Sequence, residues 1–243
     1  MDAEIVVAPH AQALAREAAG RFAALSLDAV ERRGCFSAAL AGGSTPRALY
    51  ELLADEPYRE WIPWTDVHLF WGDERCVPPD DPGSNFRMAD EALIERVPVP
   101  ADNVHRVCGE VEPGAAARAY ERELRDFFGP PGPRFDLVLL GLGEDGHTAS
   151  LFPGSSALRE TARLVIAVQA HYQGRPAQRV TLTLPTINSA RHVWFLVAGP
   201  SKAVIVEAVL QGPAGHLPAK LIHPHAGQVT WMLDAGAASR GRR

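Results

Sequence analysis

The residues best suited to chemistry in this chain are an acid and an imidazole two positions apart, Asp145 and His147. They lie in a glycine-rich segment, residues 141–147, directly after the apolar run at residues 135–140. A continuous apolar run is typical of a strand that is buried on both faces. A histidine titrates near neutral pH and can take or give a proton. The loop after this strand is therefore the first candidate for catalysis.

A second glycine-rich turn consists of Gly42, Gly43, Ser44 and Thr45, followed by Pro46. Glycines let a backbone approach a ligand closely, and free amides at a helix amino terminus can bind an anion together with the two hydroxyls. An ordinary capped turn between a strand and a helix has the same residue types, so both interpretations stay open. The Gly-Lys-Ser/Thr ending of a Walker loop is missing.

Further charged residues follow other strand-like segments. Asp73 and Arg75 come just after Val67–Trp71, Arg179 begins a strand-like run, and Lys202 stands near the start of a helix. Arg75 could hold a phosphate or carboxylate with two parallel hydrogen bonds, and Asp73 could orient a hydroxyl, a water or a histidine. Lys202 at a helix start suits a bound anion nearby. Surface ion pairs or solvated side chains are the plain alternatives.

Alternating strand and helix patterns must position these residues. Strands are predicted at Glu4–Ala8, 35–41, Val67–Trp71, 135–140, 164–168, 179–184, 193–198 and 228–233, and helices at Ala11–Arg33, 47–54, 85–96, 114–128 and 202–210. This alternation indicates an α/β fold with a doubly wound, mostly parallel sheet and helices on both faces. We expect residues 1–243 to form a single domain. Ligands of such sheets bind beyond the carboxyl ends of the strands.

Composition restricts the classes of partner. The chain has 243 residues and a formal net charge of -5, so we expect neither nucleic-acid nor anionic-membrane binding. Cys35, Cys76 and Cys108 are odd in number and far apart, which disfavours a disulfide framework or a structural zinc site and favours a reducing cytoplasm. We expect no signal peptide at residues 1–4 and no membrane-spanning run.

Several stretches in this chain form one larger pattern: residues 40–46, 71–75, 84–85, 141–154, 179–181 and 199–203. Together, and in this order, they resemble the 6-phosphogluconolactonase family over most of the chain. The pattern Gly-x-Asp-Gly-His-x-Ala-Ser-Leu-Phe-Pro is highly specific for that family, whereas Gly-Gly-Ser-Thr-Pro is not. The resemblance implies a Rossmann-like sheet related to glucosamine-6-phosphate deaminases.

The resemblance also implies an activity: hydrolysis of 6-phospho-D-glucono-1,5-lactone to 6-phosphogluconate, the second step of the oxidative pentose phosphate pathway, without metal or organic cofactor. The phosphate would lie on the amides and hydroxyls of Gly43, Ser44 and Thr45. Arg179 and Lys202 would neutralise its charge. We expect a small sugar-phosphate lactone as the partner, and a monomer or small homo-oligomer without an obligate protein partner.

In this mechanism His147 would act as the general base toward a water that attacks the lactone carbonyl, and would then protonate the departing ring oxygen. Asp73 or Asp145 would orient His147 or the sugar hydroxyls. The sequence leaves open which groups donate to the tetrahedral oxyanion: Arg75, Asn85 or the amides of the loop from Gly143 to His147.

Two other functions stay open. The related deaminases carry a catalytic glutamate five residues after the histidine, where this chain has Phe152. A non-catalytic sugar-phosphate sensor would keep the anion loop and could lose the imidazole, and this chain retains both. Residues 141–146 also match G-x-G-x-x-G, but Pro153 and Gly154 interrupt any following helix, so a nicotinamide cofactor is not expected.

Overall fold

The computed structural model describes residues 3–170, 176–213 and 215–240. Within these residues, six parallel strands form a central sheet in the order β1-β9-β8-β5-β2-β3. The strands are β1 (Glu4–Ala8), β2 (Phe36–Leu40), β3 (Val67–Trp71), β5 (Leu137–Leu140), β8 (His192–Val197) and β9 (Gln228–Asp234). Every residue of β2 and β5 is buried, as expected for strands covered on both faces. The predicted parallel sheet is confirmed.

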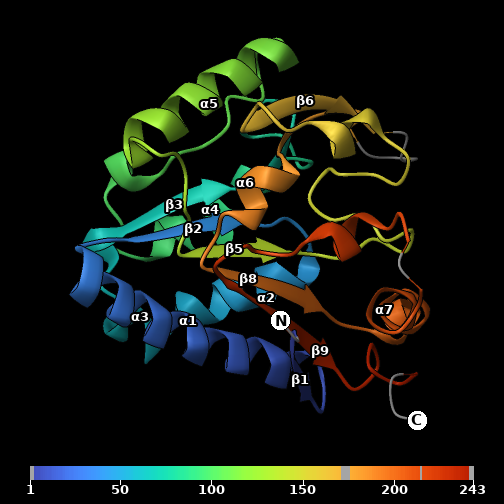
Figure 1. Cartoon of the computed structure of the whole chain (residues 1–243). Helices are drawn as coiled ribbons and strands as arrows, with labels where there is room; N and C mark the ends of the chain where they lie inside the picture. The colour runs from blue at the N-terminus through green and yellow to red at the C-terminus, as the bar shows by residue number, and fades with distance from the viewer. Residues whose placement is uncertain (1–2, 171–175, 214, 241–243) are drawn as a thin grey trace.

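Helices cover both faces of this sheet, with α1 on one side and α5 on the other (Figure 1). The helices are α1 (Ala11–Arg33), α2 (Ser44–Leu53), α3 (Tyr58–Trp61), α4 (Asn85–Ala92), α5 (Pro113–Phe128), α6 (Leu184–Asn188) and α7 (Ala203–Leu210). Short 3-10 turns occur at Trp64–Asp66, Ile94–Arg96, Ala101–Asn103, Ser156–Arg159, Pro200–Lys202 and Pro218–Leu221. No helix in the described part of the chain is long and apolar enough to cross a membrane.

Three strands of the described chain form a separate antiparallel sheet in the order β4-β7-β6. They are β4 (Asp73–Arg75), β7 (Gln178–Leu182) and β6 (Val165–Gln169). The sequence predicted the last two strands but gave residues 73–75 no strand, because three polar residues carry no alternating apolar pattern. The register pairs Asp73 with Thr181 and Arg75 with Arg179. This small sheet therefore brings charged residues of β4 and β7 together.

Two buried tyrosines hold the points where β2 and β3 end. The Tyr50 hydroxyl donates to the carbonyl of Ala41 at 2.9 Å and accepts from the amide of Ala41 at 2.9 Å. The Tyr120 hydroxyl donates to the carbonyl of Trp71 at 3.0 Å and accepts from its amide at 2.8 Å. Burial raises the pKa of both phenols, so they stay protonated. Both strands can end without leaving buried backbone groups unpaired.

Candidate active site

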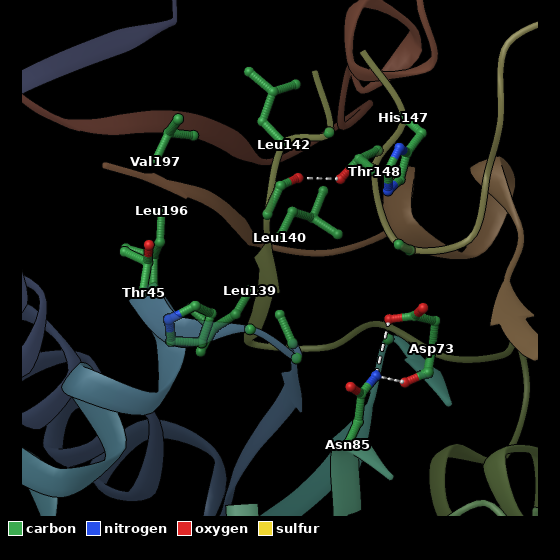
Figure 2. A pocket seen from close by; sticks show the side chains of 18 of the residues that line it. Thr45, Asp73, Asn85, Leu139, Leu140, Leu142, His147, Thr148, Leu196 and Val197 are labelled. Atoms are coloured by element: carbon green, nitrogen blue, oxygen red, sulfur yellow. Dashed lines mark hydrogen bonds between the residues drawn. The ribbon is translucent and has the colours of Figure 1, made fainter. Parts of the chain in front are cut away.

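A cavity of about 390 Å³ opens at the carboxyl ends of β2, β5 and β8 (Figure 2). We call it the strand-end cavity. It is lined by nearly every site residue that the sequence predicted: Gly42, Gly43, Ser44, Thr45, Asp73, Arg75, Asn85, Gly143, His147, Arg179 and Lys202. Asp145, the remaining predicted residue, reaches the cavity through His147. The structure thus brings residues from six separate parts of the sequence to one place.

His147 is held by the carboxylate two residues before it. The distance from His147 Nδ1 to Asp145 Oδ1 is 2.5 Å, and the backbone amide of His147 donates to the same oxygen at 3.1 Å. Burial raises the pKa of Asp145, but the hydrogen bonds from His147 outweigh this and lower it overall. An ionised Asp145 favours the tautomer with the proton on Nδ1, which leaves Nε2 as the basic ring nitrogen.

Glycine at position 143 is required by this pair. A Cβ atom there would lie 2.0 Å from His147 Nδ1 and 2.6 Å from Asp145 Oδ1. The backbone amide of Gly143 donates to the carbonyl of His147 at 2.8 Å, and that of Gly146 donates to the carbonyl of Gly143 at 3.0 Å. The loop is therefore a closed turn against which the imidazole packs.

Asp73, in contrast, belongs to a buried network with Ser150 and Arg179. The Ser150 hydroxyl donates to Asp73 Oδ2 at 2.6 Å, and Arg179 Nη1 lies 3.5 Å from the Ser150 oxygen. All three residues are less than one tenth exposed. The sequence left Asp73 and Asp145 as equal candidates to orient His147, and the structure gives the contact with the imidazole to Asp145.

The sequence did not single out Ser150, whose contact with Asp73 links two distant segments of the chain. Between His147 and Ser150, Ala149 has a φ of 47°, a left-handed conformation that is uncommon for a residue with a Cβ. Thr148 Oγ1 anchors the same turn to the carbonyl of Gly141 at 2.9 Å. Non-glycine residues in this conformation cluster at functional sites, and Ala149 lies between two residues whose side chains contact different partners.

Asn85 is fixed by two acids. Its Nδ2 donates to the carbonyl of Asp73 at 2.8 Å (Figure 2), and its backbone amide donates to Glu74 Oε1 at 2.7 Å. Glu74 also accepts from the amides of Arg75 and Phe86, so one buried carboxylate caps α4 and holds β4. Burial raises the pKa of Glu74, although the hydrogen bonds from these amides lower it in part. The sequence did not single out Glu74, although its place beside Asp73 was visible.

The glycine turn at residues 42–46 opens α2 without a capping side chain. The helix begins at Ser44, three residues earlier than predicted, and its N-cap Gly43 has a φ of 111°. Among the described residues no side chain caps these amides. This geometry favours the anion site over the ordinary capped turn. Gly42 is tied to Asn85, because a Cβ at position 42 would lie 1.9 Å from Asn85 Oδ1.

Three cationic side chains reach the strand-end cavity from different elements. Lys202 ends the 3-10 turn that precedes α7, Arg75 lies in β4 and Arg179 in β7. The Arg179 guanidinium lies 5.7 Å from the ring centroid of Phe152, and the His147 ring lies 4.7 Å from the same centroid. The Phe152 ring therefore lies against both the His147 imidazole and the Arg179 guanidinium.

The two ends of the cavity differ in character. Thr45 and the start of α2 lie on one side, while His147 and Asp73 lie on the other (Figure 2). An anion held by the α2 amides would leave the rest of its molecule pointing toward the imidazole. Within the described residues, no group of three or more histidine, cysteine or acidic side chains is arranged to hold a metal ion. The arrangement suits proton transfer on an anchored anionic molecule.

Comparison with known proteins decides the family. Residues 9–231 match the family model described as glucosamine-6-phosphate isomerases/6-phosphogluconolactonase. The chain belongs to this family. A 6-phosphogluconolactonase of Nostoc sp. is 43% identical over 217 residues, which cover 87% of each chain. A 6-phosphogluconolactonase structure from Trypanosoma brucei is 33% identical, with a TM-score of 0.87 over 98% of each chain.

The glucosamine-6-phosphate isomerase/6-phosphogluconolactonase family contains more than one chemistry on this fold. A monomeric glucosamine-6-phosphate deaminase structure is 25% identical, with a TM-score of 0.81 over 98% of this chain and 99% of its own. The fold alone thus does not separate hydrolysis from deamination. One side chain distinguishes the two reactions: position 152 carries a phenylalanine packed on His147, where the deaminase pattern has a glutamate.

Proposed function

We propose that this chain hydrolyses 6-phospho-D-glucono-1,5-lactone to 6-phosphogluconate, as in the second step of the oxidative pentose phosphate pathway. The observation that carries the proposal is the shared cavity. The imidazole that Asp145 orients lines the same cavity as an uncapped helix amino terminus and three cations. Relatives that bear the name 6-phosphogluconolactonase and match most of this chain support the same reaction.

The phosphate of the substrate lies at the α2 end of the cavity. Gly43, Ser44 and Thr45 offer amides and hydroxyls there, and Arg179 and Lys202 supply positive charge. The phosphate is on C6 and the reacting carbonyl is C1, so the two are separated by the length of the sugar. Gripping the distant phosphate holds the ring in place for attack, which makes the reaction effectively intramolecular.

His147 Nε2 accepts a proton from water as the water oxygen bonds to C1 of the lactone. The carbonyl becomes a tetrahedral oxyanion. Collapse of this intermediate breaks the bond between C1 and the ring oxygen, and His147 returns its proton to that oxygen. General acid–base catalysis of this kind contributes about 10²–10⁴-fold. Asp145 is a positioning residue, because it touches the imidazole and fixes its tautomer.

Of the three candidate donors to the oxyanion, Arg75 is the one that the existing hydrogen bonds favour. The side-chain amide of Asn85 donates to Asp73, and the amides of Gly143, Gly146 and His147 donate within their own loop. Arg75 Nη1 donates to the carbonyl of Gly83 at 2.6 Å, while Nη2 makes no hydrogen bond to any described group. The guanidinium thus keeps donors for a bound group.

The test generates the lactone in place with glucose-6-phosphate dehydrogenase and records acid release above spontaneous hydrolysis. Wild-type protein should accelerate acid release, and His147→Ala should lose about 10²–10⁴-fold in kcat while it keeps the thermal unfolding midpoint. Glucosamine 6-phosphate serves as the parallel substrate, and ammonia release would indicate the deaminase instead. Binding of the lactone or its product without turnover would indicate the sensor, and either result rejects lactone hydrolysis.

Location and assembly belong to the same proposal. A cytoplasmic enzyme needs no disulfides, and Cys35, Cys76 and Cys108 are free thiols. The cavity is built from one chain, so we propose that the sugar phosphate is its partner and that no obligate protein partner is needed. Gel filtration with the activity assay on each fraction would test this, since loss of activity in the monomer fraction contradicts it.

A further inference from the structure

Another groove, of about 490 Å³, opens at the opposite end of the parallel sheet. We call it the arginine groove and define it by Arg33, Arg134, Arg191 and His192. Arg33 ends α1, Arg134 precedes β5, and Arg191 and His192 lie where β8 begins. The groove is thus at the amino ends of the strands, at the tails of their arrows in Figure 1, and belongs to a different surface from the strand-end cavity.

The arginines of this groove outnumber the carboxylates that pair with them. Arg33 Nε donates to Asp136 Oδ1 at 2.9 Å, and Arg191 Nε lies 3.2 Å from the same oxygen. The other oxygen of Asp136 accepts from the amide and hydroxyl of Ser37, both at 2.9 Å. Arg134 Nη2 donates to a backbone carbonyl, that of Ala226, at 2.9 Å. Arg33 and Arg191 therefore share one carboxylate oxygen, and Arg134 has no acidic partner among the described residues.

The remaining acid in the groove does not restore the balance. Asp28 forms an ion pair with Arg32 at 2.6 Å, on the exposed side of α1. Arg191 Nε is buried and forms an ion pair with Asp136 Oδ1, the same oxygen that pairs with Arg33. Burial and the repulsion of Arg134 and Arg33 lower the pKa of Arg191. This local excess of positive charge stands out in a chain whose formal net charge is -5.

We propose that the arginine groove binds a small molecule that carries a phosphate group. Guanidinium groups present paired donors that match the oxygens of a phosphate, and a dianion would supply the acceptors that these arginines lack. A volume of about 490 Å³ holds more than the phosphate itself, so a phosphorylated metabolite of sugar size fits. The nearby helix end is the carboxyl end of α1, whose dipole does not attract anions, so binding depends on the arginines.

His192 supplies a local probe of occupancy. It lines the groove, and burial lowers the pKa of its imidazole. Arg33 and Arg191 add to this lowering, while Asp136 and, more weakly, Asp28 oppose it. A bound dianion would favour the imidazolium form and raise this pKa. The ring resonances of His192 in an NMR titration of the full chain, assigned with a His192→Gln variant, therefore report on this groove and not on the strand-end cavity.

The experiment titrates inorganic phosphate and, separately, 6-phosphogluconate. Both should shift the His192 resonances and raise its pKa. Arg134→Gln should weaken this binding by roughly tenfold or more, because it removes a charge-assisted donor. The matched control is Arg118→Gln in α5. Arg118 is exposed, like Arg134, with 59% of its side chain accessible, but it lies outside the groove. This variant should leave the binding unchanged.

The outcomes separate cleanly. Tighter binding of the sugar phosphate than of inorganic phosphate identifies a metabolite site, and equal binding identifies a phosphate site. Unmoved His192 resonances at tens of millimolar ligand, or equal weakening by both arginine variants, would overturn the proposal. Arg134 makes its described hydrogen bond with a backbone carbonyl, so the variant should fold, and circular dichroism checks this. Lactone turnover should persist in Arg134→Gln, which keeps this test independent of the proposed function.

Discussion

Adding one methyl group at Gly143 should disable the site without unfolding the protein. The new Cβ would lie 2.0 Å from His147 Nδ1 and 2.2 Å from its Cε1, whereas ordinary contacts begin at 3.4 Å. The imidazole must therefore move by about 1.4 Å, away from its place beside Asp145. The nearest atoms all belong to side chains, so the backbone of the loop can stay as it is.

A displacement of about 1 Å at a reacting group can cost about 100-fold in rate, which corresponds to about 2.7 kcal/mol in the activation barrier. We expect Gly143→Ala to lose at least that factor in kcat. The turn at the start of α2, which we propose as the phosphate anchor, lies on the other side of the cavity, so KM should change much less (Figure 2). Steady-state rates come from the coupled assay that generates the lactone in place, and thermal unfolding follows the fold.

The matched control is Gly20→Ala in α1. Its added Cβ meets one atom within 4 Å, the Tyr58 hydroxyl oxygen at 3.9 Å, and a helical alanine is more stable than glycine by about 0.5–1 kcal/mol. This variant should keep full activity. If folded Gly143→Ala turned over as fast as the wild type, the placement of His147 against Asp145 would have no bearing on catalysis, and the proposed mechanism would fail.

Three further changes test other parts of the structure. Lys202→Ala should raise KM with kcat nearly unchanged, because phosphate is bound in ground and transition states alike; a steady-state titration checks this. The folded pKa of Asp145 is lowered, so its ionised form stabilises the fold above the usual aspartate value of about 4, and this contribution fades at lower pH. Asp145→Asn should make urea unfolding less sensitive to acid in that range, and an unchanged pH dependence would contradict this. Tyr50→Phe should cost about 1–3 kcal/mol in the free energy of unfolding, measured in urea, because both backbone groups of Ala41 lose their partner.

The sequence predicted the main sheet because its strands are strongly patterned. The buried run that became β5 and the long helix α1 carry apolar spacing that fits one structure each. The loop containing His147 followed from its place after β5. The same reasoning gave no hint of β4, since a strand of three polar residues is stabilised by pairing with β7, which is distant in the chain.

The sequence predicted which residues lie in the site better than it predicted which of their side chains contact each other. Spacing brought Asp73 and Asp145 to the same edge of the sheet, but the choice between them depends on side-chain direction. Ala149, with its left-handed backbone, stands between His147, which contacts Asp145, and Ser150, which contacts Asp73. No local pattern encodes such a turn. Glu74 was missed for a similar reason, because its partners at the start of α4 lie 11 and 12 residues further along the chain.

The hydroxyl of Tyr50 has a consequence for how a ligand meets this protein. Its helix, α2, starts at the glycine turn, and two turns later returns the phenol to Ala41, the residue just before that turn. The segment is thereby closed into a small ring before any ligand arrives. Ordering of a loop normally subtracts from binding affinity, and here that entropy is lost during folding instead. In the proposed reaction the phosphate therefore meets a preorganised turn, and less of its binding energy is lost to ordering the loop.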